Sequence, residues 1–172
     1  MNRTLSTLVL AGSVLVATAA WAQAPMTAKA ELKNAAGEVV GQATLTETPH
    51  GVLIKTTLTN VPAGVHAFHI HAVGKCEPPF TSAGGHFNPA GKQHGLKNAM
   101  GMHAGDMPNI EVPASKQLTF EKLAMGVTLG AGANSLFDAD GSALMIHDHA
   151  DDYTSDPAGD AGPRIACGVI VK

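Results

Sequence analysis

The amino-acid sequence predicts an all-β fold, a sandwich or barrel of about eight antiparallel strands. Three observations predict it. Much of the chain consists of short segments rich in Val, Thr, Leu and Ile. Several of these segments alternate apolar with polar residues, which is the period of a strand that buries one face. Turn residues separate them, and no stretch shows an apolar helical stripe with caps.

The first four strands are expected at residues 27–34, 39–48, 52–60 and 65–72. In the first of them, Ala28, Ala30 and Leu32 alternate with charged residues, so we expect this apolar face to be buried. Glycine or proline lies in each connecting turn.

Four further strands are expected at residues 110–112, 118–123, 142–147 and 165–171. Two long segments, 74–108 and 148–163, lack strand character. Loops of that length in a compact domain are either disordered or functional. We interpret both as functional, since the first is rich in potential ligands and the second ends just before Cys167 and the last strand.

The N-terminus has the layout of a secretory signal peptide, with one base at Arg3, an apolar run and small residues before a cleavage site. We expect cleavage after residue 22 or 24, and a single mature domain at residues 25–172. The apolar run is shorter than the roughly 20 residues of a spanning helix, so no membrane association of the mature form is expected. The expected location is the periplasm or the extracellular space.

Removal of residues 1–24 would leave 10 Lys and Arg against 14 Asp and Glu, a net charge of −4. No basic stripe favours nucleic acid. An exported chain meets an oxidising compartment, so the two cysteines, Cys76 and Cys167, are expected to form a disulfide.

Six of the nine histidines lie between residues 66 and 103. His69 and His71 are two apart on an expected strand and therefore project from the same face. His66 shares the opposite face with Phe68 and Ile70, so we expect it to be a buried residue that hydrogen-bonds backbone groups.

A glycine-rich loop carries the next possible ligands, His86, His94, His103 and Asp106. Three imidazoles and one carboxylate are typical of a closed tetrahedral zinc site, although the spacing alone also allows a solvated polar loop. A second set of four nitrogens is available if His86 is shared with His69, His71 and His147. Nitrogen ligands favour copper.

These residues belong to runs that resemble Cu/Zn superoxide dismutases of the bacterial periplasmic type, from Thr27 to Lys172. The runs are HAFHIHAVGKC, SAGGHFNP, HAGDMPN, MIHDHADD and GPRIACGVI. The resemblance implies a Greek-key, immunoglobulin-like β-sandwich with one copper and one zinc ion per chain. It also implies an enzyme that converts two superoxide anions and two protons to dioxygen and hydrogen peroxide.

The resemblance assigns the ligands. Copper would be held by His69, His71, His86 and His147, and zinc by His86, His94, His103 and Asp106. His86 would be a bridging imidazolate that supplies a proton to the departing peroxide when copper is reduced.

Two further roles follow from the resemblance. Arg164 would dock the anionic substrate beside copper, whereas on its own it reads as an ordinary surface arginine. Asp151 would accept hydrogen bonds from His69 and His94, and without the resemblance it reads as a solvated acid.

The segment SDPAGDAGPR has no lysine, although some relatives use one there to steer superoxide. Lys75, Lys92, Lys97 and His149 are weaker candidates for that role.

One alternative class is a periplasmic metal carrier that binds Cu(I) through Met100, Met102 and Met107. A zinc hydrolase is disfavoured, because the zinc set would be saturated and has a single carboxylate ligand. The oligomeric state is open, and a homodimer is one option.

Overall fold

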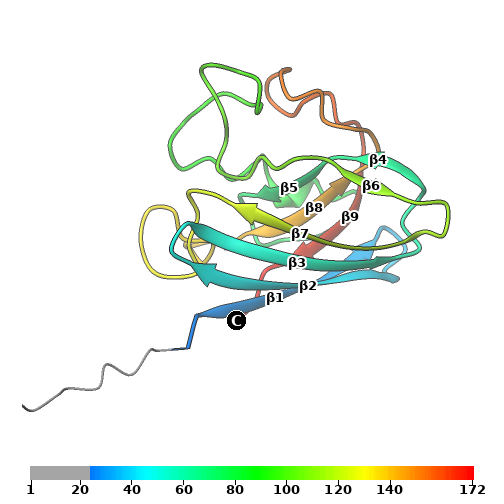
Figure 1. Ribbon diagram of the computed structural model, residues 1–172, viewed down its shortest axis with the longest axis horizontal. Helices are drawn as coiled ribbons and strands as arrows, with labels where there is room; N and C mark the ends of the chain where they lie inside the picture. The colour runs from blue at the N-terminus through cyan, green and yellow to red at the C-terminus, as the bar shows by residue number, and fades with distance from the viewer. Residues whose placement is uncertain (1–23) are drawn as a thin grey trace, which may run out of the picture.

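A computed structural model describes residues 24–172, and these form a curled antiparallel β structure, as the sequence predicts (Figure 1). The predicted signal peptide lies outside the described residues except for Ala24. The strands are β1 (Thr27–Asn34), β2 (Val39–Thr48), β3 (Gly51–Thr59), β4 (Gly64–His66), β5 (Phe68–His71), β6 (Ile110–Val112), β7 (Gln117–Ala124), β8 (Ala143–His147) and β9 (Arg164–Val169). Among residues 24–172 no helix is long and apolar enough to cross a membrane.

Seven strands curl into one sheet in the order β5-β8-β9-β1-β2-β3-β7, and β4 pairs with β6 in a second, small sheet. Every pairing between these nine strands of residues 24–172 is antiparallel. Neighbouring hairpins join β1 to β2 and β2 to β3, whereas the chain crosses to reach β4 and β8. The described residues thus contain nine strands, one more than the eight segments predicted from the sequence.

The additional strand arises because the segment expected at 65–72 divides at Ala67. The Ala67 N–H donates to the carbonyl of His149, and the Ala67 carbonyl accepts from the N–H of His147. The chain therefore changes partners at this residue: β4 before it pairs with β6, and β5 after it pairs with β8.

The core is mainly aliphatic. Ala28, Ala30 and Leu32 are all buried, which confirms the face predicted for β1. Full burial of a leucine-sized side chain contributes about 1.5–3 kcal/mol. Phe68 of β5 and Phe120 of β7 come from the two edge strands of the large sheet, and their rings pack edge to face with their centroids 5.1 Å apart.

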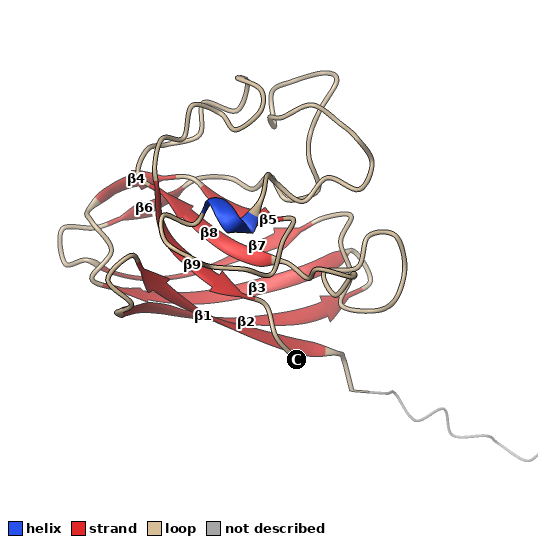
Figure 2. Ribbon diagram, turned by 180° about the vertical axis from the view of Figure 1, so that it is seen from behind, coloured by secondary structure: helices blue, strands red, loops and turns tan. Residues whose placement is uncertain are grey.

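The two long loops lie together at one end of the barrel, above β5 and β8 (Figures 1 and 2). Residues 74–108 are free of strands, as predicted, and contain one short 3-10 helix, η1 (Thr81–Ala83). Phe80 and Ala83 pack on Ala143 and Met145 of β8. The Cys76–Cys167 disulfide confirms the predicted pairing, and it fixes the start of this loop to β9 with a Cα–Cα distance of 5.6 Å.

Candidate metal centre

The sheet positions three of the predicted ligands, His69 and His71 on β5 and His147 at the end of β8. All three are buried. The ring centroid of His147 lies 5.2 Å from that of His69 and 5.5 Å from that of His71. The two histidines of β5 therefore share one face, which the loops cover.

His86 reaches this face because its loop is bound to β5 through backbone hydrogen bonds. The Ile70 N–H donates to the carbonyl of Gly105, and the Ile70 carbonyl accepts from the N–H of Phe87. A Cβ at Gly105 would collide with the Ile70 carbonyl oxygen, so only glycine allows this close approach. The ring of His86 then lies against that of His69, with 4.1 Å between centroids.

Nδ1 of His86 faces a second set of donors. Asp106 Oδ1 lies 2.7 Å from Nδ1 of His86, 3.1 Å from Nδ1 of His94 and 3.3 Å from Nδ1 of His103. The two Nδ1 atoms of His86 and His103 are 3.4 Å apart. A tetrahedral ion with Zn–N bonds of about 2.0–2.1 Å separates its ligand atoms by about 3.3 Å. The spacing of this donor set therefore fits zinc.

Nε2 of His86 faces the other set. Two buried ring nitrogens, Nδ1 of His69 and Nε2 of His86, have no hydrogen-bond partner among the described residues. Buried polar atoms are rarely left without a partner. Nε2 of His71 and Nε2 of His147 lie 3.3 Å apart in the same group. Four nitrogen donors converge here, a set that suits copper.

Carbonyl groups fix the orientation of two of these rings. Nδ1 of His71 lies 3.0 Å from the Gly84 carbonyl oxygen, and Nδ1 of His147 lies 3.3 Å from that of Gly162. Each Nδ1–H donates to its carbonyl, which leaves the Nε2 lone pairs turned inward as metal ligands require.

Burial keeps most of these imidazoles neutral. Desolvation lowers the pKa of His86 to about 4 and that of His147 to about 3, and it places the pKa of His71 well below its ordinary value. Neutral imidazoles offer a lone pair to a metal at pH 7.

The zinc-side groups behave differently. Burial opposes charge on His94, but its contacts with Asp106 and Asp151 prevail and raise its pKa to about 9. Burial likewise opposes ionisation of Asp106, yet the hydrogen bonds from His86 and His94 hold the pKa of that carboxyl far below its usual range. The carboxylate is therefore available as an anionic ligand.

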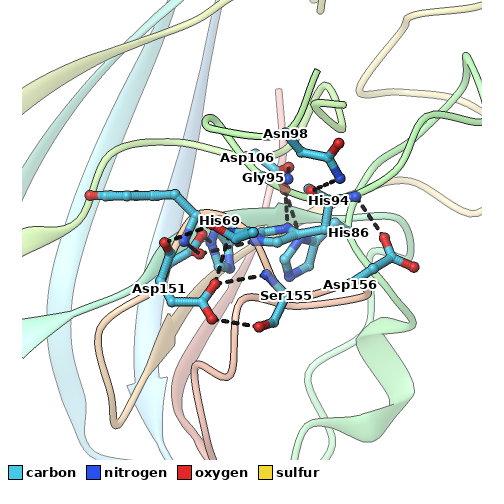
Figure 3. A network of polar contacts seen from close by, with 12 residues as sticks. His69, His86, His94, Gly95, Asn98, Asp106, Asp151, Ser155 and Asp156 are labelled. Carbon is cyan, nitrogen blue, oxygen red and sulfur yellow. Dashed lines mark hydrogen bonds and ion pairs between the residues drawn. The ribbon is translucent and has the colours of Figure 1, made fainter. Parts of the chain in front are cut away.

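Asp151 binds one histidine of each donor set, His69 and His94 (Figure 3). Its Oδ2 accepts from Nε2 of His69 at 2.9 Å, and its Oδ1 accepts from Nε2 of His94 at the same distance. Both contacts leave Nδ1 of the histidine free to face its donor set. Asp151 is itself buried.

Arg164 begins β9 beside the copper-side donors. Its guanidinium donates to the carbonyl oxygens of Phe80 at 2.6 Å and Gly84 at 2.7 Å. The Gly84 carbonyl thus receives hydrogen bonds from both Arg164 and His71.

His66 is buried, and its ring nitrogens lie 2.9 Å from the carbonyl oxygens of Pro62 and His147. These contacts confirm the structural role predicted for it. The methionines proposed as Cu(I) ligands of a metal carrier differ in exposure. Met107 is buried in the main core, whereas Met100 is 68% exposed.

The possible steering residues are spread over the surface. Lys75 pairs with Glu77 at 3.1 Å, and the exposed His149 lies 3.6 Å from Asp148. Lys97 has its Nζ 5.2 Å from the centre of the Tyr153 ring.

Two residues around the site were missed by sequence reasoning. Asn109 binds the backbone of Asp151 with its side-chain amide, and Tyr153 binds both Asn109 and Asp151. The only signal for Asn109 was its place at the end of the run HAGDMPN. The sequence offered no signal for Tyr153, since it lies in a long loop without a periodic pattern.

The copper/zinc superoxide dismutase family model matches residues 39–170. The chain belongs to the copper/zinc superoxide dismutase family. It is 54% identical to superoxide dismutase [Cu-Zn] 2 of Aquifex aeolicus, over 94% of this chain and 96% of that protein. It is 44% identical to the superoxide dismutase [Cu-Zn] of Caulobacter vibrioides, over 83% of this chain and 84% of that one.

The fold is shared with solved structures of the family. A double mutant of a superoxide dismutase-like protein from Bacillus subtilis superposes with a TM-score of 0.81 at 40% identity. The match covers 84% of this chain and 97% of that one. The curled antiparallel sheet and the two loops above it are thus the family's architecture.

Proposed function

We propose that this chain is a superoxide dismutase that converts two superoxide anions and two protons to dioxygen and hydrogen peroxide. One observation carries the proposal. The ring of His86 presents Nδ1 to two other imidazoles and a carboxylate, and Nε2 to three other imidazoles. A single imidazole shared by two such sets would serve as a ligand of both a redox-active and a structural metal.

The proposed copper ligands are His69, His71, His86 and His147, and the proposed zinc ligands are His86, His94, His103 and Asp106. The donor types support the assignment, since nitrogen-only sets favour copper and a closed set of three nitrogens and one oxygen favours zinc. When bound, copper supplies one-electron reduction and oxidation by turns, which zinc cannot do.

His86 and Asp151 determine which ring nitrogens of the site carry protons. Nε2 of His86 is buried and has no hydrogen-bond partner among the described residues, so a proton held there is available to the reduced product. Asp151 keeps the protons of His69 and His94 on Nε2, so that Nδ1 of each ring is a ligand.

Arg164 is proposed to bind the substrate. A guanidinium has five N–H donors and stays charged at all working pH values. Two carbonyls of residues 80 and 84 anchor it, and its remaining donors are available to a small oxyanion.

Export to the periplasm or extracellular space is proposed together with the signal peptide at residues 1–24 and a mature domain at residues 25–172. The Cys76–Cys167 disulfide supports this location, because disulfides persist in oxidising compartments. The bacterial origin of the relatives also supports it.

The test uses residues 25–172 loaded with copper and zinc. Elemental analysis should give one of each metal per chain, and superoxide removal should depend on both. His147→Ala should lose copper and almost all activity, whereas the exposed His50→Ala should lose neither. An unchanged rate in His147→Ala would contradict the proposal. Copper that exchanges freely with a chelator, without superoxide removal, would favour the metal carrier.

A further inference from the structure

Tyr153 lies where the two long loops meet, and it contacts Asp151 of its own loop and both Lys97 and Asn109 of the other part of the chain around the zinc-side donors. We propose that Tyr153 is a positioning residue, which fixes the Asp151 carboxylate and the His94 loop so that the zinc ligands keep their geometry. This inference rests on the proposed function and extends it to a residue that contacts neither metal.

The backbone of Tyr153 makes the first two contacts. Its N–H donates to Oδ1 of Asp151 at 2.6 Å, the same oxygen that accepts from His94. Its carbonyl accepts from the N–H of Lys97 at 3.0 Å. The carbonyl also lies so close to Gly95 that a Cβ there would collide with it. Tyr153 therefore bears directly on the segment that carries His94.

The phenol makes the third contact. The Tyr153 hydroxyl accepts from the N–H of Asn109 at 2.8 Å. The side chain of Asn109 holds both backbone groups of Asp151: its Oδ1 accepts from the Asp151 N–H and its Nδ2 donates to the Asp151 carbonyl, each at 2.9 Å. Tyr153, Asn109 and Asp151 thus form a closed ring of hydrogen bonds.

This ring is anchored to the sheet. Nζ of Lys122, on β7, donates to the carbonyl of Asn109 at 3.1 Å. Asn109 thus links the Asp151 backbone to β7, and the phenol contact adds a second link between this loop and Asn109. Without the hydroxyl, the Asn109 N–H would lose its acceptor and the connection would depend on Asn109 alone.

The conformation of Tyr153 supports a role for its side chain. Its φ is 68°, in the left-handed region that glycine or asparagine enters easily and a bulky residue enters at a cost. If the backbone contacts alone mattered, glycine would serve them better. The ring adds the Asn109 contact and a face over which Lys97 lies, with Nζ 5.2 Å from the centroid.

The test compares Tyr153→Phe, which removes only the hydroxyl, with Tyr153→Gly, which relaxes the backbone and removes the ring. Ser155→Ala is the matched control, because it deletes a hydroxyl of the same loop that bonds only the exposed Asp152. Zinc affinity is measured by competition with a chromophoric chelator. Cobalt(II) is placed in the zinc site, and its visible absorption reports the ligand geometry. The melting temperature of each metal-free variant is also recorded.

Tyr153→Phe should bind zinc about tenfold more weakly, the lower end of the range for outer-shell partners, and should shift the cobalt bands. Tyr153→Gly should lose at least as much affinity, and Ser155→Ala should match the unsubstituted chain. The inference fails if Tyr153→Phe or Tyr153→Gly stays within twofold of the unsubstituted chain. It also fails if affinity falls with a lowered metal-free melting temperature and unchanged cobalt bands, since Tyr153 would then be purely structural. Failure of the unsubstituted chain to bind one zinc would instead overturn the proposed function.

Discussion

The Nε2 atoms of His71 and His147 face each other across 3.3 Å, although 76 positions separate the two residues in the sequence. The Nδ1–H of His71 donates to the carbonyl of Gly84, and that of His147 donates to the carbonyl of Gly162. Two lone pairs therefore point into the same small space. A cation between them relieves the repulsion, so the metal-free site is less stable than the loaded one.

Copper should accordingly stabilise the folded chain. A ligand that binds only the folded state at 100 times its Kd adds about 2.7 kcal/mol to the free energy of unfolding. We expect the melting temperature of the zinc-loaded protein to rise when copper is added, as measured by calorimetry. In His71→Ala the rise should be much smaller, and an equal rise in that variant would contradict the ligand assignment.

His103→Ala should separate the two metals. His103 faces only the zinc-side donors, whereas the copper-side set keeps its four imidazoles. Loss of an outer-shell partner alone weakens metal binding by about 10–100-fold, so loss of this ligand should weaken zinc binding by more than about 100-fold. Elemental analysis after dialysis against a chelator should find copper retained and zinc absent. Full zinc occupancy would exclude His103 as a ligand.

Arg164→Ala should slow the reaction without removing copper. Local positive charge raises association rates of anions by about 10–1000-fold, and kcat/KM should fall within that range. The activity of the variant should also depend less on ionic strength. Lys75→Ala is the control, since Lys75 is exposed and paired with Glu77. An equal loss of rate in both variants would argue against a specific role for the arginine.

Replacing Cys76 and Cys167 with serine should destabilise the chain. The bridge spans 91 residues, and closure of such a loop contributes about 4–5 kcal/mol in the chain-entropy description. The loop start also carries the carbonyl of Phe80 that anchors Arg164. Urea unfolding should show the loss of stability, and activity should fall with it. A stability change below about 1 kcal/mol would mean that the unfolded chain is already constrained.

The metal-free protein should be most stable near pH 6.5. His86 and His147 have folded pKa values of about 4 and about 3, below their ordinary 6.5, because burial disfavours their charged forms. Their contribution is complete above pH 6.5 and is lost as the pH falls towards those values, where the unfolded chain binds more protons.

His94 has the opposite effect on stability. Its folded pKa is raised to about 9, so its contribution is complete below pH 6.5 and is lost as the pH rises to 9. Urea unfolding of the metal-free protein at several pH values measures both the loss of stability at low pH and the loss at high pH. A flat profile would show that these groups titrate alike in the folded and unfolded chains.

The strands were predictable because alternation of apolar and polar residues reflects a local property, the burial of one face. The break at Ala67 was not, since it depends on hydrogen bonds with residues 147 and 149, far along the chain. Spacing placed His69 and His71 on one face and left His147 as a possible further nitrogen ligand, which the resemblance then assigned to copper.

The resemblance led to the bonds of Asp151 with His69 and His94, but its contacts with Asn109 and Tyr153 were outside the reach of sequence reasoning. Tyr153 acts through a hydroxyl that accepts from a backbone N–H, and no pattern of residue types records such a contact. Asn109 belongs to the run HAGDMPN, which resembles the family. Its two hydrogen bonds to the Asp151 backbone, however, depend on how the two long loops meet in space.

The backbone bonds that tie residues 87 and 105 to Ile70 have a consequence for the order of assembly. The strands and these two anchors place all four copper-side imidazoles, so we expect that half of the centre to form together with the sheet. His94 and His103 lie in the span between the anchors and have no strand of their own. Their half of the centre should be completed later, when the span settles against the second loop. Changes of length between the anchors should therefore disturb zinc binding first and leave the nitrogen-only set intact.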